Sequence, residues 1–323
     1  MTEDALIFAF VLDGRGGGTQ VSWPELDKWR PEDGIQWVHL DCTHGDTNTW
    51  LANKANIDPV IQEALTAEET RPRYCKYQNG LLLILRGVNL NPGADPEDMI
   101  SIRLWIEENR IISARRSKIL AIDDIRRAIP VGEGPKDVGE FILRLTDGLA
   151  HRMTSVISGL EDAIDEIEIQ VLEQQDVTLR TAINSNLMQV IRLRRYLAPQ
   201  REVINQLHRE NEGFVSEADR VYLREVADTF TRYVEDLNAS KDRIEVIHNE
   251  LETRINTQMG KTMYLLTIIA AIFLPLGLLA GLLGINVGGI PWAENPSGFL
   301  IVSVALLIIG LVQLLVFRKM RWI

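Results

Sequence analysis

The chain has few cysteines and no excess of basic residues, and each absence excludes a class of protein. Only Cys42 and Cys75 occur in 323 residues, too few for a fold held together by disulfides. Acidic residues outnumber basic ones by 45 to 34, which gives a formal net charge of -11. A nucleic-acid partner is not expected, because neutralising phosphates requires clustered Lys and Arg. The acidic balance suits attraction of cations, and equally a solvated acidic surface.

The sequence also lacks any signature of catalysis, nucleotide binding or secretion. The run Gly14–Gly18 has neither the Lys-Ser/Thr pair of a P-loop nor the order GxGxxG. We therefore interpret it as a turn, and expect neither an enzyme nor an enzymatic cofactor. The N-terminus is acidic and its apolar run Leu6–Leu12 is short, which predicts a strand rather than a signal peptide.

Two long runs towards the C-terminus lack charge altogether. They cover Met263–Leu283 and Phe299–Phe317. At about 1.5 Å of rise per residue, the first run would span about 30 Å, the thickness of bilayer hydrocarbon. We predict two transmembrane helices, about 263–283 and 299–317, joined by an external loop of residues 284–298.

The flanking charges predict the orientation of these spans. Basic residues occur only on the side of each span away from the loop: Arg254, Lys261, Arg318, Lys319 and Arg321. Positive flanks stay inside, so both termini should be cytoplasmic and the protein should lie in the inner or plasma membrane. Residues 318–323 form a basic cytoplasmic tail.

Residues 1–136 alternate between strand-like and helix-like patterns, which predicts a mixed α/β cytoplasmic domain. Strands are expected at Leu6–Leu12, Gln36–Leu40, Leu81–Leu85, Ile100–Ile106 and Arg110–Ala114. Helices are expected at Pro59–Thr66 and Lys118–Ile129.

Residues 137–215 read as the helical, coiled-coil part of this domain. One apolar seam advances in steps of three and four through Ile157, Leu160, Ile164, Ile167 and Val171. A second helix is expected from Leu179 to about Glu212, with a kink at Pro199. Ser216 can cap a third helix, which meets no Pro or Gly before Met259 and should continue into the first span. Residues 216–283 would then be one stalk helix connecting cytoplasm to membrane.

Two groups of residues resemble metal ligands. His39, Asp41, Cys42, His44 and Asp46 are close in sequence, but their spacing matches no zinc motif, so we interpret them as structural. Glu245, His248 and Glu252 share one face of the stalk helix. They could form a cytosolic metal site or simply a solvated face.

The spans carry small and neutral polar residues but no acid or His. Gly277 and Gly281 form a GxxxG pattern, which favours close packing of helices from several copies or reflects the general abundance of glycine in membrane helices. The most polar side chains at membrane depth are Thr267 and Gln313. A cation passing here would meet no charged ligand, so it would cross hydrated or be held by neutral oxygens.

One stripe of the first span is the candidate pore wall. Counting back from Asn286 at helical spacing gives Gly281, Gly277, Leu274, Ala270, Leu266 or Thr267, and Met263. A wall this apolar could gate by expelling water, with Met263 and Leu266 as the expected constriction. The alternative is that this stripe packs against the second span.

The order of these parts resembles the CorA family of divalent-cation transporters. The loop opens with Gly284-Ile285-Asn286 where that family has Gly-Met-Asn, and Gly284–Pro291 is more similar to its zinc-transporting ZntB branch. Phe273–Pro275 and the segment Leu193–Val203 fit the same branch. The resemblance covers essentially the whole chain.

This resemblance implies a funnel-shaped homopentamer in which the first spans line a pore through the lipid bilayer. Gly284, Ile285 and Asn286 would form the ion entrance, with Asn286 contacting the water shell of the cation and Glu294 concentrating cations at the mouth. The implied cargo is a divalent cation, with Zn²⁺ favoured and Mg²⁺, Co²⁺ or Ni²⁺ as alternatives. An alternative hypothesis is that the protein does not conduct ions and is a membrane-anchored coiled-coil assembly protein.

Overall fold

The computed structural model describes residues 5–173, 178–209, 214–285 and 295–320. The chain divides into two compact units, Met1–His248 and Asn249–Ile323. The first unit contains the expected α/β fold followed by long helices, and the second contains two apolar helices. The predicted fold class is therefore confirmed.

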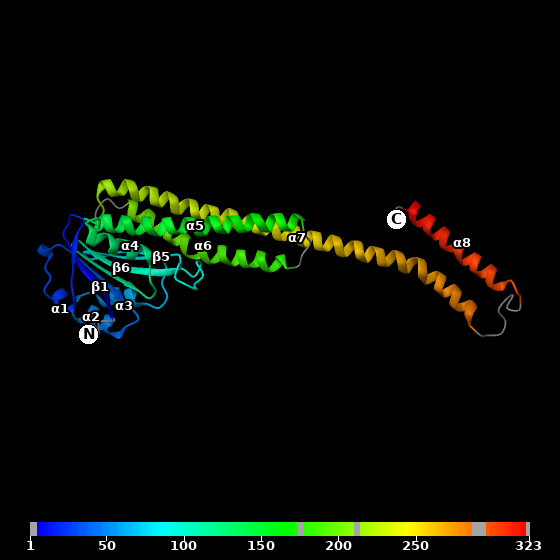
Figure 1. Ribbon diagram of the computed structural model, residues 1–323, viewed down its shortest axis with the longest axis horizontal. Coiled ribbons are helices and arrows are strands. Elements are labelled where there is room, and N and C mark those ends of the chain that lie inside the picture. Colours follow the sequence, from blue (N-terminus) through cyan, green and yellow to red (C-terminus); the bar gives the residue numbers. More distant parts are fainter. Residues whose placement is uncertain (1–4, 174–177, 210–213, 286–294, 321–323) are drawn as a thin grey trace. The chain divides into compact units, whose positions relative to one another are not determined.

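A seven-stranded sheet forms the centre of the first unit (Figure 1). Its strands are β1 (Leu6–Leu12), β2 (Gly18–Gln20), β3 (Ile35–Asp41), β4 (Arg73–Tyr77), β5 (Gly80–Gly87), β6 (Ile100–Glu107) and β7 (Arg110–Arg115). They lie in the order β2-β1-β3-β7-β6-β5-β4. Only β3 and β7 pair in parallel, whereas every other neighbouring pair is antiparallel.

Helices cover both faces of the sheet, which explains why its central strands are apolar along nearly their whole length. One face is covered by α1 (Trp23–Leu26), α2 (Gly45–Asn53) and α3 (Pro59–Thr66). The other is covered by α4 (Leu120–Ala128), α5 (Val138–Glu173) and α6 (Leu179–Arg209). Successive residues of β3 point to opposite faces, so Val38 packs with α2 and α3, while Trp37 meets Phe141 of α5 edge to face at 4.9 Å.

All five predicted strands and both predicted helices of this region are present, but five short elements were missed. These are β2, β4, α1, α2 and the 3-10 helix Pro31–Asp33. Each is short or polar, and β4 (Arg-Tyr-Cys-Lys-Tyr) lacks an apolar run because it is an edge strand. The expected helix at Lys118–Ile129 is α4 followed by a 3-10 turn, Ile129–Val131.

The segment Leu193–Val203 fastens α6 to the sheet. Strand β4 pairs with β5 only as far as Ile84, which leaves the backbone of Arg86 without a strand partner on that side. The Gln200 side chain replaces the missing strand: its Oε1 accepts from the Arg86 backbone N–H at 2.6 Å, and its Nε2 donates to the Arg86 carbonyl at 2.9 Å. The Arg86 guanidinium lies 4.2 Å above the Tyr196 ring. Tyr196 and Gln200 thus have a structural role.

The apolar seam predicted on α5 is buried. It packs with α6 and with α7 (Glu217–Gly284), so that Ile164, Ile167, Ile183, Ile244 and Ile247 surround one small void. Arg243 of α7 pairs with Asp165 and Glu168, part of the acidic face of α5. Ser216 caps α7 as expected, because its Oγ accepts from the Asp219 backbone N–H at 3.1 Å.

The group from His39 to Asp46 spans the end of β3 and the start of α2. His39 is fully buried and stacks on Phe8 at 4.7 Å, with Nδ1 2.8 Å from Ser113 Oγ. Cys42 belongs to the core on the opposite face, and Asp41 accepts from Thr43 in a turn. Among the described residues, no three His, Cys, Asp or Glu side chains are close enough to hold a metal ion.

Burial holds the pKa of His39 well below its ordinary value, and the charges of Arg115 and Arg126 act in the same direction. The folded state therefore keeps His39 neutral at a pH where the unfolded chain would bind a proton there. The folded state should therefore lose stability as the pH falls below about 6.5, the pKa of a histidine in the unfolded chain.

We predict that the free energy of unfolding of the first unit falls between pH 7 and 5, with a His39 contribution of up to about 1.4 kcal/mol per pH unit. His39→Phe keeps an aromatic ring against Phe8 and should remove this contribution. Five of the seven tryptophans lie in the first 105 residues, so tryptophan fluorescence during denaturant titration of the full chain reports on this unit. Equal pH slopes for parent and variant would contradict the prediction.

Candidate ion pathway

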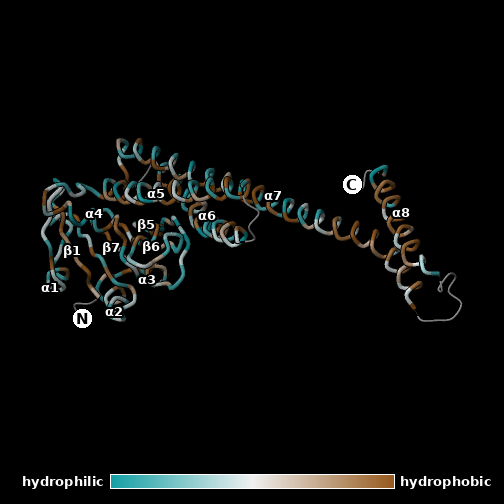
Figure 2. Tube along the Cα trace, turned by 45° about the vertical axis from the view of Figure 1, so that its right-hand side comes forward, coloured by the Kyte–Doolittle hydropathy of each residue, from teal (hydrophilic) through white to brown (hydrophobic). Residues whose placement is uncertain are grey.

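The second unit consists of the last part of α7 and α8 (Gly298–Lys319). Both helices are long and apolar enough to cross a membrane. In each helix, the most apolar stretch contains no buried residue. Figure 2 shows the hydrophobic colour over the end of α7 and most of α8. Because these side chains find no core in this chain, lipid or other copies of the chain must cover them.

One face of α7 packs against α8. In the span from Met263 to Gly284 the half-buried residues are Ile268, Ala271, Ile272 and Leu276. The corresponding residues of α8 recur at helical spacing: Val302, Leu306, Ile309, Gly310, Gln313 and Phe317. At Gly310 the two helices are near each other, since an added Cβ would lie 3.6 Å from Leu276 Cδ1. Glycine therefore lets the two helices come together here.

The candidate pore stripe lies on the opposite side of α7. Every member is exposed in the single chain: Met263, Leu266, Thr267, Ala270, Leu274, Gly277 and Gly281. At 100° per residue, Ala270 and Leu274 each point about 160° away from Ile272, which faces α8. Added Cβ atoms at Gly277, Gly281 or Gly284 would meet nothing within 4 Å. The α8 helix of the same chain therefore leaves this stripe uncovered.

The stripe offers a cation almost no ligands. Its only polar side chain is Thr267, whose Oγ1 donates to the Met263 carbonyl at 2.9 Å within the same helix. No charged side chain lies on it. Such a surface cannot bind a divalent ion tightly, but it can let a hydrated ion pass when wide and exclude water when narrow.

The predicted entrance lies mostly beyond the described residues. Gly284 is the last residue of α7 and Ile285 is exposed. Asn286 and Glu294 fall outside the described ranges. Their roles at the entrance stay predictions.

The predicted cytosolic metal site at Glu245, His248 and Glu252 stays a prediction. Glu245 accepts from Lys241 Nζ one turn earlier at 2.5 Å. The described residues, which include Glu245, His248 and Glu252, contain no group of three acidic, His or Cys side chains close enough to hold a metal. Side chains three and seven positions apart along one helix share a face, but the outer two lie about 10 Å apart along the axis, too far to reach one ion easily.

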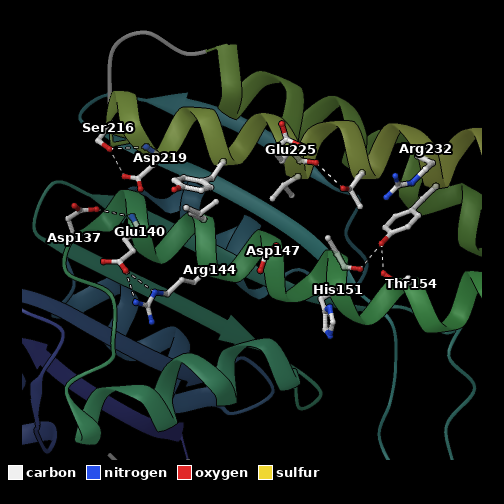
Figure 3. Close-up of a pocket in the computed structure, with 16 residues that line it drawn as sticks. Asp137, Glu140, Arg144, Asp147, His151, Thr154, Ser216, Asp219, Glu225 and Arg232 are labelled. Atoms are coloured by element: carbon white, nitrogen blue, oxygen red, sulfur yellow. Dashed lines mark hydrogen bonds and ion pairs between the residues drawn. The ribbon is translucent and has the colours of Figure 1, made fainter.

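A groove between α5 and α7 was not predicted from the sequence. It is a cavity of about 760 Å³ in the first unit, shown in Figure 3. Tyr233 closes one end, with its hydroxyl 2.6 Å from Thr154 Oγ1. At the other end Glu140 and Arg144 form an ion pair of 2.6 Å. Burial by itself would raise the pKa of Glu140, but hydrogen bonds from the Lys136 backbone N–H and from Arg144 hold that pKa below its ordinary value.

The groove is acidic in balance. Its lining includes Asp137, Glu140, Asp147, Asp219 and Glu225, against the two arginines 144 and 232. Among the described residues these acids form no group of three that is close enough to hold a metal ion, and their negative balance can attract cations. The sequence gives only a weak signal for this groove. Acidic residues recur at helical spacing on α5 and α7, but α6 separates these two helices in the sequence.

The whole chain is similar to known transporters. A family model described as CorA-like Mg²⁺ transporter protein matches residues 32–319. The divalent cation transporter CmaX of Pseudomonas aeruginosa is 37% identical over 99% of this chain and 98% of its own length. The zinc transport protein ZntB of Yersinia enterocolitica is 32% identical over 98% of this chain and 96% of its own.

Solved structures show the same likeness. The structure of full-length CmaX superimposes with a TM-score of 0.86 at 36% identity, covering 100% of this chain and 99% of its own. The complete structure of the CorA magnesium transporter from Methanocaldococcus jannaschii gives a TM-score of 0.81 over 98% of this chain and 99% of its own. At 18% identity, this second likeness is one of fold alone.

The uncovered stripe on α7 can be mapped with single cysteines in a background in which Cys42 and Cys75 are replaced by alanine. Hydrophilic thiol reagents should label cysteine at 263, 266, 270, 274 and 277 in membranes, and should spare 268, 272 and 276, which face α8. Labelling without a helical period, or confined to positions 265, 268 and 272, would place any aqueous path on another face.

Proposed function

The chain belongs to the CorA-like Mg²⁺ transporter family, a family of divalent-cation transporters, and from this premise we propose the path that the cation takes. Several copies, five by likeness to the family, surround one axis, and the stripe of α7 from Met263 to Gly281 lines the path. The observation that carries this proposal is the exposure of that stripe on the side of α7 opposite α8.

Several copies are needed because two helices cannot enclose a polar path. Gly277 and Gly281 have no neighbour within 4 Å of an added Cβ, so the α8 helix of the same chain leaves this side of α7 open to a path. In this arrangement α8 lies on the outer side of α7, towards lipid. The apolar wall gates by width, and Met263 and Leu266 form the narrow neck near the cytoplasmic end.

The entrance lies at the outer end of the path. Gly284, Ile285 and Asn286 receive the hydrated cation, and the Asn286 amide oxygen contacts its water shell. Copies of Glu294 raise the local cation concentration. Both chain termini lie in the cytoplasm, because the basic residues flank the spans on the side away from the loop.

Zinc is the favoured cargo. Support comes from the relative named as a zinc transport protein, at 32% identity over 98% of this chain, and from the similarity of the loop Gly284–Pro291 to the ZntB branch. Magnesium is the second candidate, because the matching family model is named for Mg²⁺. Neutral oxygens at the entrance do not by themselves prefer zinc, which binds N and S ligands well.

Flux into liposomes containing the purified protein tests this proposal. We expect uptake of Zn²⁺ in preference to Mg²⁺, with Co²⁺ and Ni²⁺ tested in parallel. Preference for Mg²⁺ would reverse the assignment of cargo, and absence of flux for every metal would favour a non-conducting membrane anchor.

The same assay tests the entrance with a pair of variants. Asn286→Ala should reduce uptake by about tenfold or more, because the amide meets the hydrated ion. Asn295→Ala is the matched control from the far end of the same connection, where the Asn295 side chain accepts from the Ser297 backbone N–H at 2.9 Å. It should leave uptake close to that of the parent. Equal uptake by Asn286→Ala and the parent at all metal concentrations would remove Asn286 from the entrance.

A further inference from the structure

Pro275 leaves one backbone carbonyl of α7 without its helical partner. It lies inside the helix, within the first apolar span. Proline has no N–H, so the carbonyl of Ala271, four residues earlier, receives no hydrogen bond from the helix. In hydrocarbon there is no water to compensate, and such groups are satisfied by neighbouring helices or polar side chains.

The second orphan group belongs to α8. Gln313 is the one amide side chain in the described parts of the two spans, and its Oε1 is buried without a hydrogen-bond donor. Gln313 lies on the half-buried face of α8, with Gly310 and Phe317. Its polar end is therefore enclosed against α7 rather than directed to the outside of the hairpin.

The packing of the two helices sets these orphan groups at the same level. Gly310 meets Leu276, and α8 runs back alongside the end of α7 (Figure 1). Three residues further along α8 correspond to about 4.5 Å, or three residues backwards along α7. This places Gln313 opposite the turn that contains Ala271 and Ile272, both half-buried on the face towards α8.

A half-turn of the Gln313 amide exchanges its oxygen and nitrogen ends. The buried end then presents two N–H donors to a site where a carbonyl lacks one. We propose that Gln313 donates a hydrogen bond to the Ala271 carbonyl released by Pro275, and so clamps α8 to the bend of α7.

Gln313 is thus a positioning residue for the pore wall. Ala270 and Leu274 of the stripe belong to the same turn of α7 as Ala271, and each points about 160° away from Ile272. The clamp fixes the direction of α7 at Pro275 and therefore the line along which the stripe faces the axis. Its effect on transport rests on the proposed function, whereas its effect on the stability of the hairpin does not.

A double-mutant cycle tests the clamp on the full chain in lipid nanodiscs. Gln313→Leu removes the amide and keeps the helix apolar, and Pro275→Ala restores the backbone N–H that the Ala271 carbonyl lost. Thermal unfolding of the assembly and Zn²⁺ uptake in liposomes are measured for the parent, both single variants and the double variant. Ser303→Ala is the control, because Ser303 is a polar residue on the exposed side of α8.

The clamp predicts strong coupling between the two positions. Gln313→Leu should lower the unfolding temperature and reduce uptake several-fold when Pro275 is present, and should change neither when residue 275 is alanine. Ser303→Ala should behave like the parent in both backgrounds. Equal effects of Gln313→Leu in the two backgrounds would overturn the clamp, even with normal uptake by the parent. Coupling in unfolding temperature without uptake by any variant would keep the clamp and reject the proposed function.

Discussion

The rest of the structure depends on one constraint: the two apolar helices cannot bury their surfaces within a single chain. A soluble core would enclose such residues, but here the most apolar windows of α7 and α8 are wholly unburied. Lipid can cover most of this surface at no cost. It gives no reason for a glycine-bearing, uncovered stripe on the side of α7 away from α8. In the proposed assembly, an axis shared by several copies would account for the membrane location and the stripe together.

In the first unit, a side chain completes the interrupted backbone hydrogen bonding of the sheet. The sheet is covered on both faces, and where β4 stops short, Gln200 supplies the hydrogen bonds of the missing strand to Arg86. The same device recurs in our inference for the membrane hairpin, where the Gln313 amide replaces the donor that Pro275 lacks. In both places a glutamine side chain completes an interrupted backbone pattern, which is most valuable where water is excluded.

Much of this fold could be predicted from the sequence, because the strongest signals are periodic and local. The five main strands, the buried seam of α5 and the Ser216 cap of α7 are all confirmed. Strand β4 was missed because an edge strand carries charge instead of an apolar run. The role of Tyr196 and Gln200 could not be predicted, because their partner Arg86 is more than a hundred residues away. Spacing along one helix suggests a metal site at Glu245, His248 and Glu252, and that site stays a prediction. Periodicity alone could not tell which face of α7 contacts α8 and which face carries the uncovered stripe. That distinction depends on how the two helices pack.

The central claim is that α7 lines a path shared by several identical chains, and the mass of the purified assembly tests it most directly. Native mass measurement in detergent or nanodiscs, on protein that has never been cross-linked, counts the chains without reference to transport. The account predicts one main species of five chains, each of 36.5 kDa, with the α7 stripes facing one another. A monomer or dimer as the main species would contradict it, because neither can surround a path with the stripe of α7.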